Sequence, residues 1–292
     1  MLFKSYILYI NICKKLIRFN NKIKIKNQKP FLSICIPIYN TEKYIKRAVL
    51  SVINQSFQDF ELIIINDFSN DNTGKIIKRL SNIDNRIKYI NHIKNLGVHY
   101  SRVEAVLNSK GKYILFLDPD DMLLNGNLFK ELFKYNLYNN FDIIEFIVYL
   151  EKEGKNNIFY PKEHSLNHNH NYKFNIIYQP ELKDIIYYKP RTKNYSVIIC
   201  RTVWNKIYKS ELLLKTIKYI GKINNHYLII ADDTMINLIS FHFANNYSNI
   251  NIPGYLYFVK SKSMSKGYIG KEHRIKQNIS FYYFFKLLYR RI

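Results

Sequence analysis

A single segment, residues 113–121, constrains the fold of this chain more than any other. It starts with consecutive apolar residues, Tyr113 to Leu117, and ends in three closely spaced carboxylates, Asp118, Asp120 and Asp121. Consecutive apolar residues are typical of a strand covered on both faces of an α/β sheet. Pro119 lacks an N–H and must end the strand, so the acids lie at its carboxyl end, where open α/β sheets bind ligands. Such carboxylates repel one another unless a cation or several donors compensate them; a solvated acidic turn that caps a helix is the alternative interpretation.

The preceding part of the chain alternates apolar strands with amphipathic helices. We predict strands at residues 32–37, 60–65 and 87–90, and helices around residues 44–53, 70–80 and 98–108. Pro37 is expected to end the first strand. Polar residues gather where the strands stop. This alternation predicts a doubly wound, mostly parallel α/β sheet with ligands at the strand ends.

Glycine-rich phosphate loops are absent from the sequence. The first predicted strand is followed by Ile38-Tyr39-Asn40 instead of G-x-G-x-x-G, and no G-x-x-x-x-G-K-[ST] loop occurs. These absences exclude a dinucleotide-binding Rossmann turn and a P-loop. Without a glycine cradle, a bound diphosphate would need a divalent cation and basic side chains, which the carboxylate cluster and Arg102 could provide.

Net charge and cysteine content restrict the possible classes of function only slightly. The chain of 292 residues has 45 Lys and Arg against 22 Asp and Glu, a net charge of +23. This balance suggests an anionic partner, such as nucleic acid, acidic lipid or a phosphorylated substrate, although the basic residues are spread along the chain. A nucleic-acid-binding basic α/β protein is therefore the rival hypothesis, but no nucleic-acid-binding module occurs. The cysteines lack C-x-x-C spacing and predict reduced thiols in a cytosolic protein.

Several motifs that occur in a fixed order resemble the family 2 glycosyltransferases, inverting enzymes of the GT-A fold that use nucleotide-sugar donors. The motifs lie at residues 33–40, 51–57, 65–71, 95–98, 101–102 and 111–121, and more weakly at 203–208, 232–237 and 263–265. The resemblance implies a Rossmann-like, mixed, mostly parallel sheet flanked by helices, with a helical C-terminal extension. It divides the chain into a basic amphipathic leader (1–29), a GT-A domain (30–265) and an aromatic, basic C-terminal segment (266–292). Within the GT-A domain, residues 30–125 would bind the nucleotide sugar and residues 126–265 would bind the acceptor.

The resemblance also implies a reaction and a set of site residues. The reaction is an inverting transfer of a sugar from a nucleoside-diphosphate sugar to a hydroxyl of a cell-surface glycan or lipid-linked oligosaccharide, assisted by Mg²⁺ or Mn²⁺. Carried over position by position, the residues implied for nucleotide and donor binding are Pro37, Tyr39, Asp67, Arg102, Asp118 and Asp120. Asp121 would hold the metal and Asp233 would be the general base. The acceptor side would be formed by Trp204, Lys206 and Asp232.

Each of these assignments has a structural alternative. Asp67 could cap the following helix, Arg102 could be a surface helix residue, and Trp204 could belong to the core. Asp232 and Asp233 could simply stabilise a helix N-terminus.

The chain also departs from the family pattern at four positions, one of which is Val103, where the family often has Asn. Asn66 replaces a usual Asp, Phe68 a usual Gly, and Phe258 a usual Arg, for which Lys260 or Lys262 could substitute as a point charge. These departures leave a catalytically inactive homologue as a further alternative.

Both ends of the chain lie outside the resemblance. Residues 1–29 mix basic and apolar side chains, and residues 280–292 are rich in aromatic residues and end in two arginines. Neither segment is suited to crossing a bilayer, but each could lie on an anionic membrane face. A plain basic leader and a helix packed on the domain are the respective alternatives. The expected location is the cytoplasm, with peripheral contact at the inner face of the cytoplasmic membrane as an option and no nucleic-acid partner.

Overall fold

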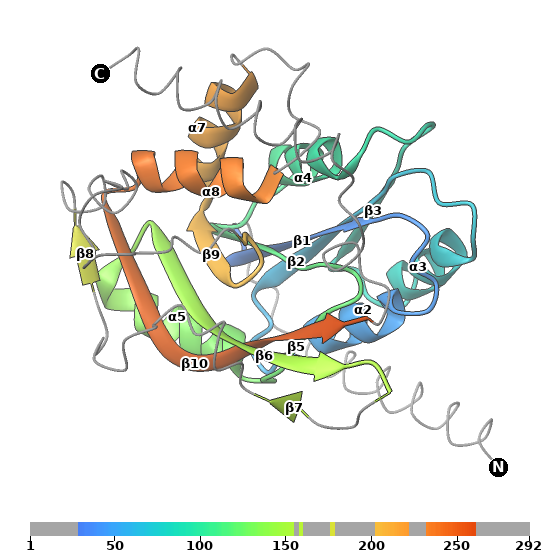
Figure 1. Ribbon diagram of the computed structural model, residues 1–292, viewed down its shortest axis with the longest axis horizontal. Helices are drawn as coiled ribbons and strands as arrows, with labels where there is room; N and C mark the ends of the chain where they lie inside the picture. Colours follow the sequence, from blue (N-terminus) through green and yellow to red (C-terminus); the bar gives the residue numbers. More distant parts are fainter. Residues whose placement is uncertain (1–28, 155–157, 160–175, 179–201, 222–231, 261–292) are drawn as a thin grey trace, which may run out of the picture.

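The computed structural model describes residues 29–154, 158–159, 176–178, 202–221 and 232–260 (Figure 1). Within these ranges the chain forms one mixed sheet with helices on both faces. The strands are β1 (Leu32–Ile38), β2 (Phe60–Asn66), β3 (Ile87–Asn91), β4 (Tyr113–Phe116), β5 (Met122–Leu123), β6 (Ile143–Lys152), β7 (Ile158–Phe159), β8 (Ile176–Tyr178), β9 (Lys206–Lys209) and β10 (Asn246–Val259). The helices are α2 (Ile45–Ile53), α3 (Thr73–Ser81), α4 (Val98–Leu107), α5 (Leu128–Asn139), α7 (Ser210–Gly221) and α8 (Asp232–Phe243).

Parallel strands in the order β3-β2-β1-β4 form the first half of the sheet. In this half, Ile38 of β1 lies beside Asn66 of β2, and Cys35 lies beside Phe116 of β4. Because these strands run in the same direction, their carboxyl ends meet along one edge of the sheet. The loops that leave this edge span residues 39–44, 67–72, 92–97 and 117–121.

The second half of the sheet is mixed and brings a distant strand to the acidic segment. β9 runs antiparallel to β4 and β6, whereas β10 is parallel to β6 and antiparallel to β5. The long strand β10 bends sharply in Figure 1, and its pairing register with β6 shifts between Asn249 and Tyr255. The bend allows Leu256 to pair with Met122, directly after the acids. β10 therefore forms one wall of the candidate site.

Two hydrophobic clusters fill the two faces of the sheet. α2, α3 and α5 pack against one face, and α4, α7 and α8 pack against the other (Figure 1). Neighbouring residues of β1 alternate between them, with Ile34 in the first cluster and Cys35 in the second, both fully buried. This alternation follows from the two-residue period of a strand, and the helices on both faces explain why the central strands β1, β2 and β4 are mostly apolar on both sides.

The predicted fold class, a mixed and mostly parallel sheet flanked by helices, is confirmed. In the first half, the predicted strands and helices are present with small shifts of their ends. The prediction that Pro37 ends the first strand was wrong, because β1 continues through Pro37 to Ile38. The pairing of β1 with β4 stops at Cys35, so the missing N–H of Pro37 removes no hydrogen bond on that side.

The predicted terminal segments fall almost entirely outside the described residues. These are the basic leader at 1–29, of which only Lys29 is described, and the extension at 266–292, together with the membrane contacts suggested for both. In the part of the chain that is described, we find no helix with the length and apolarity needed to cross a membrane.

Candidate functional site

The acidic turn after β4 is held in a fixed shape by its own backbone and by β1. The N–H of Leu117 donates to the carbonyl of Cys35 at 3.0 Å, which carries the strand pairing up to the first acid. The N–H of Asp121 then donates to the carbonyl of Asp118 at 3.1 Å and closes the turn. As a result the acids differ in environment: Asp118 and Asp120 are partly exposed, whereas Asp121 is 1% exposed.

Asp121 is anchored to β10 through both of its carboxylate oxygens. Tyr255 Oη donates to Oδ2 and the N–H of Phe258 donates to Oδ1, each at 2.7 Å. Burial, followed by the charges of Asp118 and Asp120, raises the pKa of Asp121 well above its usual range. These contacts do not suit the role of metal ligand predicted for Asp121, because a cation would have to reach a buried group whose oxygens already hold β10 in place.

Basic side chains surround the two exposed acids. Arg102 Nη2 lies 3.1 Å from Asp118 Oδ1, and Lys260 Nζ lies 2.7 Å from Asp120 Oδ2. Arg47 Nη2 donates to the backbone carbonyl of Asp120 at 3.0 Å. Lys260 thus places a positive charge beside the acids, as suggested for the missing arginine at position 258. Arg47 was not predicted, because it lies on α2, far from the acids in sequence.

Arg102 connects the acidic turn with the predicted general base. It lies on α4 and is buried, and its Nη1 forms an ion pair with Asp233 Oδ1 in the first turn of α8. The predicted alternative of a surface position for Arg102 is therefore wrong. The structure brings Asp118, Arg102 and Asp233 together from three separate elements. Asp232 begins α8, as the helix N-terminus interpretation predicts, but its side chain lies outside the described residues.

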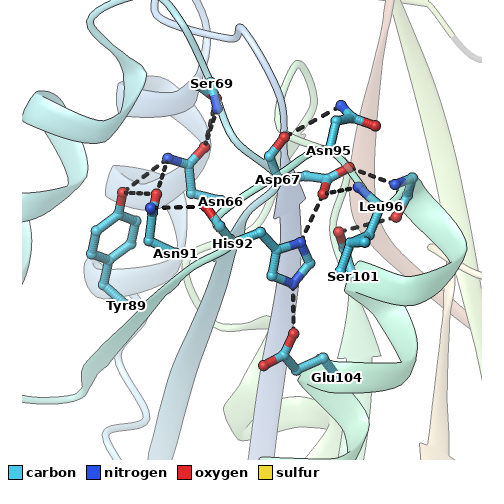
Figure 2. Close-up of polar contacts among 11 residues, drawn as sticks. Asn66, Asp67, Ser69, Tyr89, Asn91, His92, Asn95, Leu96, Ser101 and Glu104 are labelled. Carbon is cyan, nitrogen blue, oxygen red and sulfur yellow. Dashed lines mark hydrogen bonds and ion pairs between the residues drawn. The ribbon is translucent and has the colours of Figure 1, made fainter.

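Asp67 organises the loop that precedes α4 (Figure 2). Its Oδ1 accepts from the N–H of Leu96 and its Oδ2 from the N–H of Gly97, both at 2.7 Å. His92 Nδ1 lies 2.7 Å from Asp67 Oδ1, and Asn95 Nδ2 donates to the Asp67 backbone carbonyl at 3.3 Å. The buried carboxylate thus holds residues 92–97 in place, and any contact of its own with a nucleotide stays a prediction.

Asn66 uses both ends of its amide in the same cluster (Figure 2). Its Nδ2 donates to Tyr89 Oη at 3.0 Å and to Asn91 Oδ1 at 2.6 Å, while its Oδ1 accepts from Ser69 Oγ at 2.6 Å. An aspartate has no N–H donor for Asn91, so the asparagine at this departure from the family pattern is matched to its partners.

The remaining predicted donor-binding residues, Pro37 and Tyr39, lie at the end of β1, and Phe68, a departure from the family pattern, lies at the end of β2. Pro37 is the penultimate residue of β1 and is buried, and its contact with a nucleotide stays a prediction. Tyr39 follows β1 and is about half exposed. Phe68 follows β2 and is also about half exposed, with a backbone φ of 65°.

The predicted acceptor-side residues separate into an aromatic stack and a buried lysine. Trp204 stacks on Tyr255 and Tyr257 of β10, with ring centroids 4.5 and 5.4 Å apart. It is partly buried and packs against the core, so both the core interpretation and a contact with a sugar are compatible with its position. Lys206 is fully buried, and its Nζ lies 3.3 Å from Glu145 Oε2. An acceptor cannot reach this ammonium group, so the acceptor-side role predicted for Lys206 is corrected to a structural one.

A divalent cation would have to be held by few protein ligands. Among the described residues, no group of three or more His, Cys, Asp or Glu side chains could hold a metal ion. Mg²⁺ does not need such a group, because one or two carboxylates together with substrate phosphates commonly bind it. The partly exposed carboxylates of Asp118 and Asp120 fit that mode.

Comparison with known proteins agrees with this architecture. The sequence profile of Glycosyl transferase family 2 matches residues 33–205. An uncharacterized glycosyltransferase of Methanocaldococcus jannaschii is 32% identical over 253 residues, covering 84% of this chain and 80% of the relative. Glycosyltransferase GlyA of Streptococcus pneumoniae is 26% identical over 238 residues, covering 80% of this chain; the match spans only 31% of that longer protein.

The same fold occurs in a solved structure. S. aureus TarS 1-349, in complex with UDP-GlcNAc, matches with a TM-score of 0.63 at 20% identity, over 85% of this chain and 65% of that chain. The family profile covers more than half of the chain, and the M. jannaschii relative is matched over most of its length. The chain therefore belongs to glycosyl transferase family 2.

Proposed function

We propose that the protein transfers a sugar from a nucleoside-diphosphate sugar to an acceptor hydroxyl with inversion at the anomeric carbon. The observation that carries this proposal is the meeting of Asp118, Arg102 and Asp233 at the carboxyl edge of the parallel strands. Uridine diphosphate is the first candidate nucleotide, because the structurally similar TarS is seen with UDP-GlcNAc. Family membership argues against the nucleic-acid-binding alternative.

Donor binding would depend on the basic residues around the acidic turn. Arg102, Lys260 and Arg47 lie within contact of Asp118 or Asp120, so a diphosphate at this edge would meet several positive charges. Asp118 and Asp120 would hold a Mg²⁺ or Mn²⁺ ion together with the phosphates. When bound, this ion would offset the negative charge of the departing nucleoside diphosphate. We assign the metal to these two carboxylates in preference to Asp121, whose hydrogen bonds tie the turn to β10.

Asp233 would act as the general base. In the transfer step, the acceptor oxygen forms a bond to the anomeric carbon while the bond from that carbon to the phosphate oxygen breaks. The hydroxyl proton passes to the Asp233 carboxylate, and the nucleoside diphosphate leaves with the bonding electrons. The ion pair with Arg102 fixes the position of Asp233 before the acceptor arrives.

The acceptor would lie beside the aromatic stack of Trp204, Tyr255 and Tyr257. Aromatic faces suit the apolar faces of sugar rings, so we propose a hydroxyl of a glycan, free or lipid-linked, as the acceptor class. The acceptor-side role of Asp232, the first residue of α8, stays a prediction.

The test separates catalysis from donor binding. In Asp233→Asn we expect transfer from a UDP-sugar to fall by about 10²–10⁴-fold, the usual contribution of a general base, while the affinity for UDP stays within about twofold. The exposed acid Glu211 on α7 supplies a matched control, since Glu211→Gln makes the same chemical change away from the site. Unaltered transfer in Asp233→Asn would assign the base to another residue. A wild-type protein that binds nucleotide but turns over no sugar donor would support the inactive homologue instead.

A further inference from the structure

Phe68 adopts a backbone conformation that is rarely tolerated by an aromatic residue. Its φ is 65°, in the left-handed region. Among the described residues, the other non-glycine residues with positive φ are Asn40 and Asn140. The Cβ of any non-glycine residue crowds the backbone in this region; asparagine offsets this cost because its short polar side chain bonds locally, whereas phenylalanine has no such group. A glycine at position 68 would avoid this strain.

The strain at Phe68 is imposed by the turns on both sides of it. Just before it, the Asp67 carboxylate accepts the N–H of Leu96 (Figure 2) and also the N–H of Gly97. Just after it, Ser69 Oγ accepts from the N–H of Asn40 at 3.0 Å, which ties the turn to the end of β1. The backbone therefore cannot relax at position 68 without breaking these bonds.

Core packing does not account for the aromatic ring. The side chain of Phe68 is 45% exposed, and it belongs to neither hydrophobic cluster of the described residues. Local strain that persists without a packing gain is a feature of functional sites. Because Ile38 pairs with Asn66, the loop residues Tyr39 and Phe68 leave neighbouring strands at the same edge of the sheet. Two half-exposed aromatic residues thus lie at the edge where the donor nucleotide is proposed to bind.

We propose that Phe68 is a stacking platform for the nucleobase of the donor, an inference that rests on the proposed function. A flat aromatic ring offers a nucleobase a stacking partner of the same shape. Every nucleobase has such a face, so Phe68 would favour nucleotides over phosphates that lack a base, without selecting one base. The choice of base would come from hydrogen bonds elsewhere. The phenylalanine at this position thus strains the backbone but increases the affinity for the nucleotide.

The experiment exploits the opposite effects of the ring and the backbone. In Phe68→Gly we expect the melting temperature to rise by about 2–6 °C, because the strain is relieved. Affinity for UDP in the presence of Mn²⁺, measured by titration calorimetry, should fall by about 5- to 100-fold through loss of stacking. Affinity for inorganic pyrophosphate, which has no base, should stay within about twofold. If the ring instead served to pack the protein, its removal would lower the melting temperature.

Two further substitutions and a control complete the design. Phe68→Ala should lose UDP affinity without gaining stability, because alanine keeps the strain, and Phe68→Tyr should restore affinity to within about threefold of wild type. Ile93→Ala removes a side chain that is 89% exposed on a neighbouring loop and should change nothing. The inference is overturned if Phe68→Gly binds UDP as wild type does, or if it melts lower, since the ring would then pack within the protein. Wild-type protein that binds none of UDP, GDP, CDP or ADP would overturn the proposed function together with this inference.

Discussion

His92 should make the stability of the protein depend on pH. Its ring is buried between two carboxylates, with Nδ1 2.7 Å from Asp67 Oδ1 and Nε2 2.5 Å from Glu104 Oε2 (Figure 2). A neutral imidazole carries one N–H and can donate to only one of these carboxylates, so both contacts require the imidazolium. Burial by itself lowers the pKa of His92, but the hydrogen bonds and charges of Asp67 and Glu104 outweigh it and raise the pKa above 6.5.

The size of the effect follows from the exposure of each pair. His92 and Asp67 are each 5% exposed, so their charge-assisted hydrogen bond should contribute about 1.5–3 kcal/mol. Glu104 is 38% exposed, and solvent screening reduces its contribution to about 0–1 kcal/mol. Because the folded-state pKa is raised, this stabilisation is complete below the unfolded-state pKa of about 6.5. It is lost as the pH rises through the folded-state pKa of His92.

Urea unfolding of wild type and His92→Gln from pH 5.5 to pH 9 tests this reasoning. Glutamine cannot titrate, so the free energy of unfolding of the variant should be lower by about 2–3 kcal/mol near pH 5.5. The difference should narrow to less than about 1 kcal/mol at alkaline pH, because wild type then loses its imidazolium. Glu104→Gln is the matched control and should cost less than about 1 kcal/mol. A difference that stays constant across this pH range would refute a protonated His92.

Other substitutions test the interior. Gly111→Ala should destabilise the protein by about 1–3 kcal/mol in urea unfolding, because the new Cβ would lie 2.5 Å from the backbone N of Ser33. Lys206→Met should lower the free energy of unfolding by about 3 kcal/mol, because Glu145 loses its buried counter-ion. The double variant with Glu145→Gln should recover part of this loss. If the losses of the two single variants simply added in the double variant, the pairing would be contradicted. Burial raises the pKa of Cys35 to about 12, so iodoacetamide at pH 8 should alkylate it only after unfolding, as mass spectrometry would show.

The first half of the fold was predictable from sequence because its signals are local. Apolar runs and amphipathic periods located β1 to β4 and α2 to α4, and parallel strands place all their ends on one edge. The second half depends on pairings between distant segments, such as β10 with β5, which local periodicity cannot show. Pro37 was misjudged for a related reason, since its tolerance within β1 depends on where β4 stops pairing.

The site was predictable as a region but not in the role of each residue. Consecutive acids look alike in a sequence, yet the turn exposes Asp118 and Asp120 and buries Asp121 against Tyr255. That contact joins residues 134 positions apart, so no local motif contains it. Burial and the charges of Asp121 and Asp118 raise the pKa of Tyr255 well above its usual range, which keeps it a donor to Asp121. In the same way, the sequence around Lys206 suggested an acceptor-side residue, whereas in the folded protein Lys206 is fully buried in β9.

Arg102 explains how acids from distant parts of the chain coexist at one edge of the sheet. It is buried between Asp118 and Asp233, and each carboxylate keeps its place because the guanidinium offsets its charge. Arg102→Met keeps much of the side-chain length but removes this charge, so Asp118 and Asp233 would be left without their shared partner. We expect UDP affinity and transfer rate to fall together, each by about 10–100-fold, the value of one charge-assisted hydrogen bond. Asp233→Asn should lose transfer alone. If Arg102→Met lost transfer but kept UDP affinity, Arg102 would serve only to position Asp233, and the donor phosphates would depend on Lys260 and Arg47.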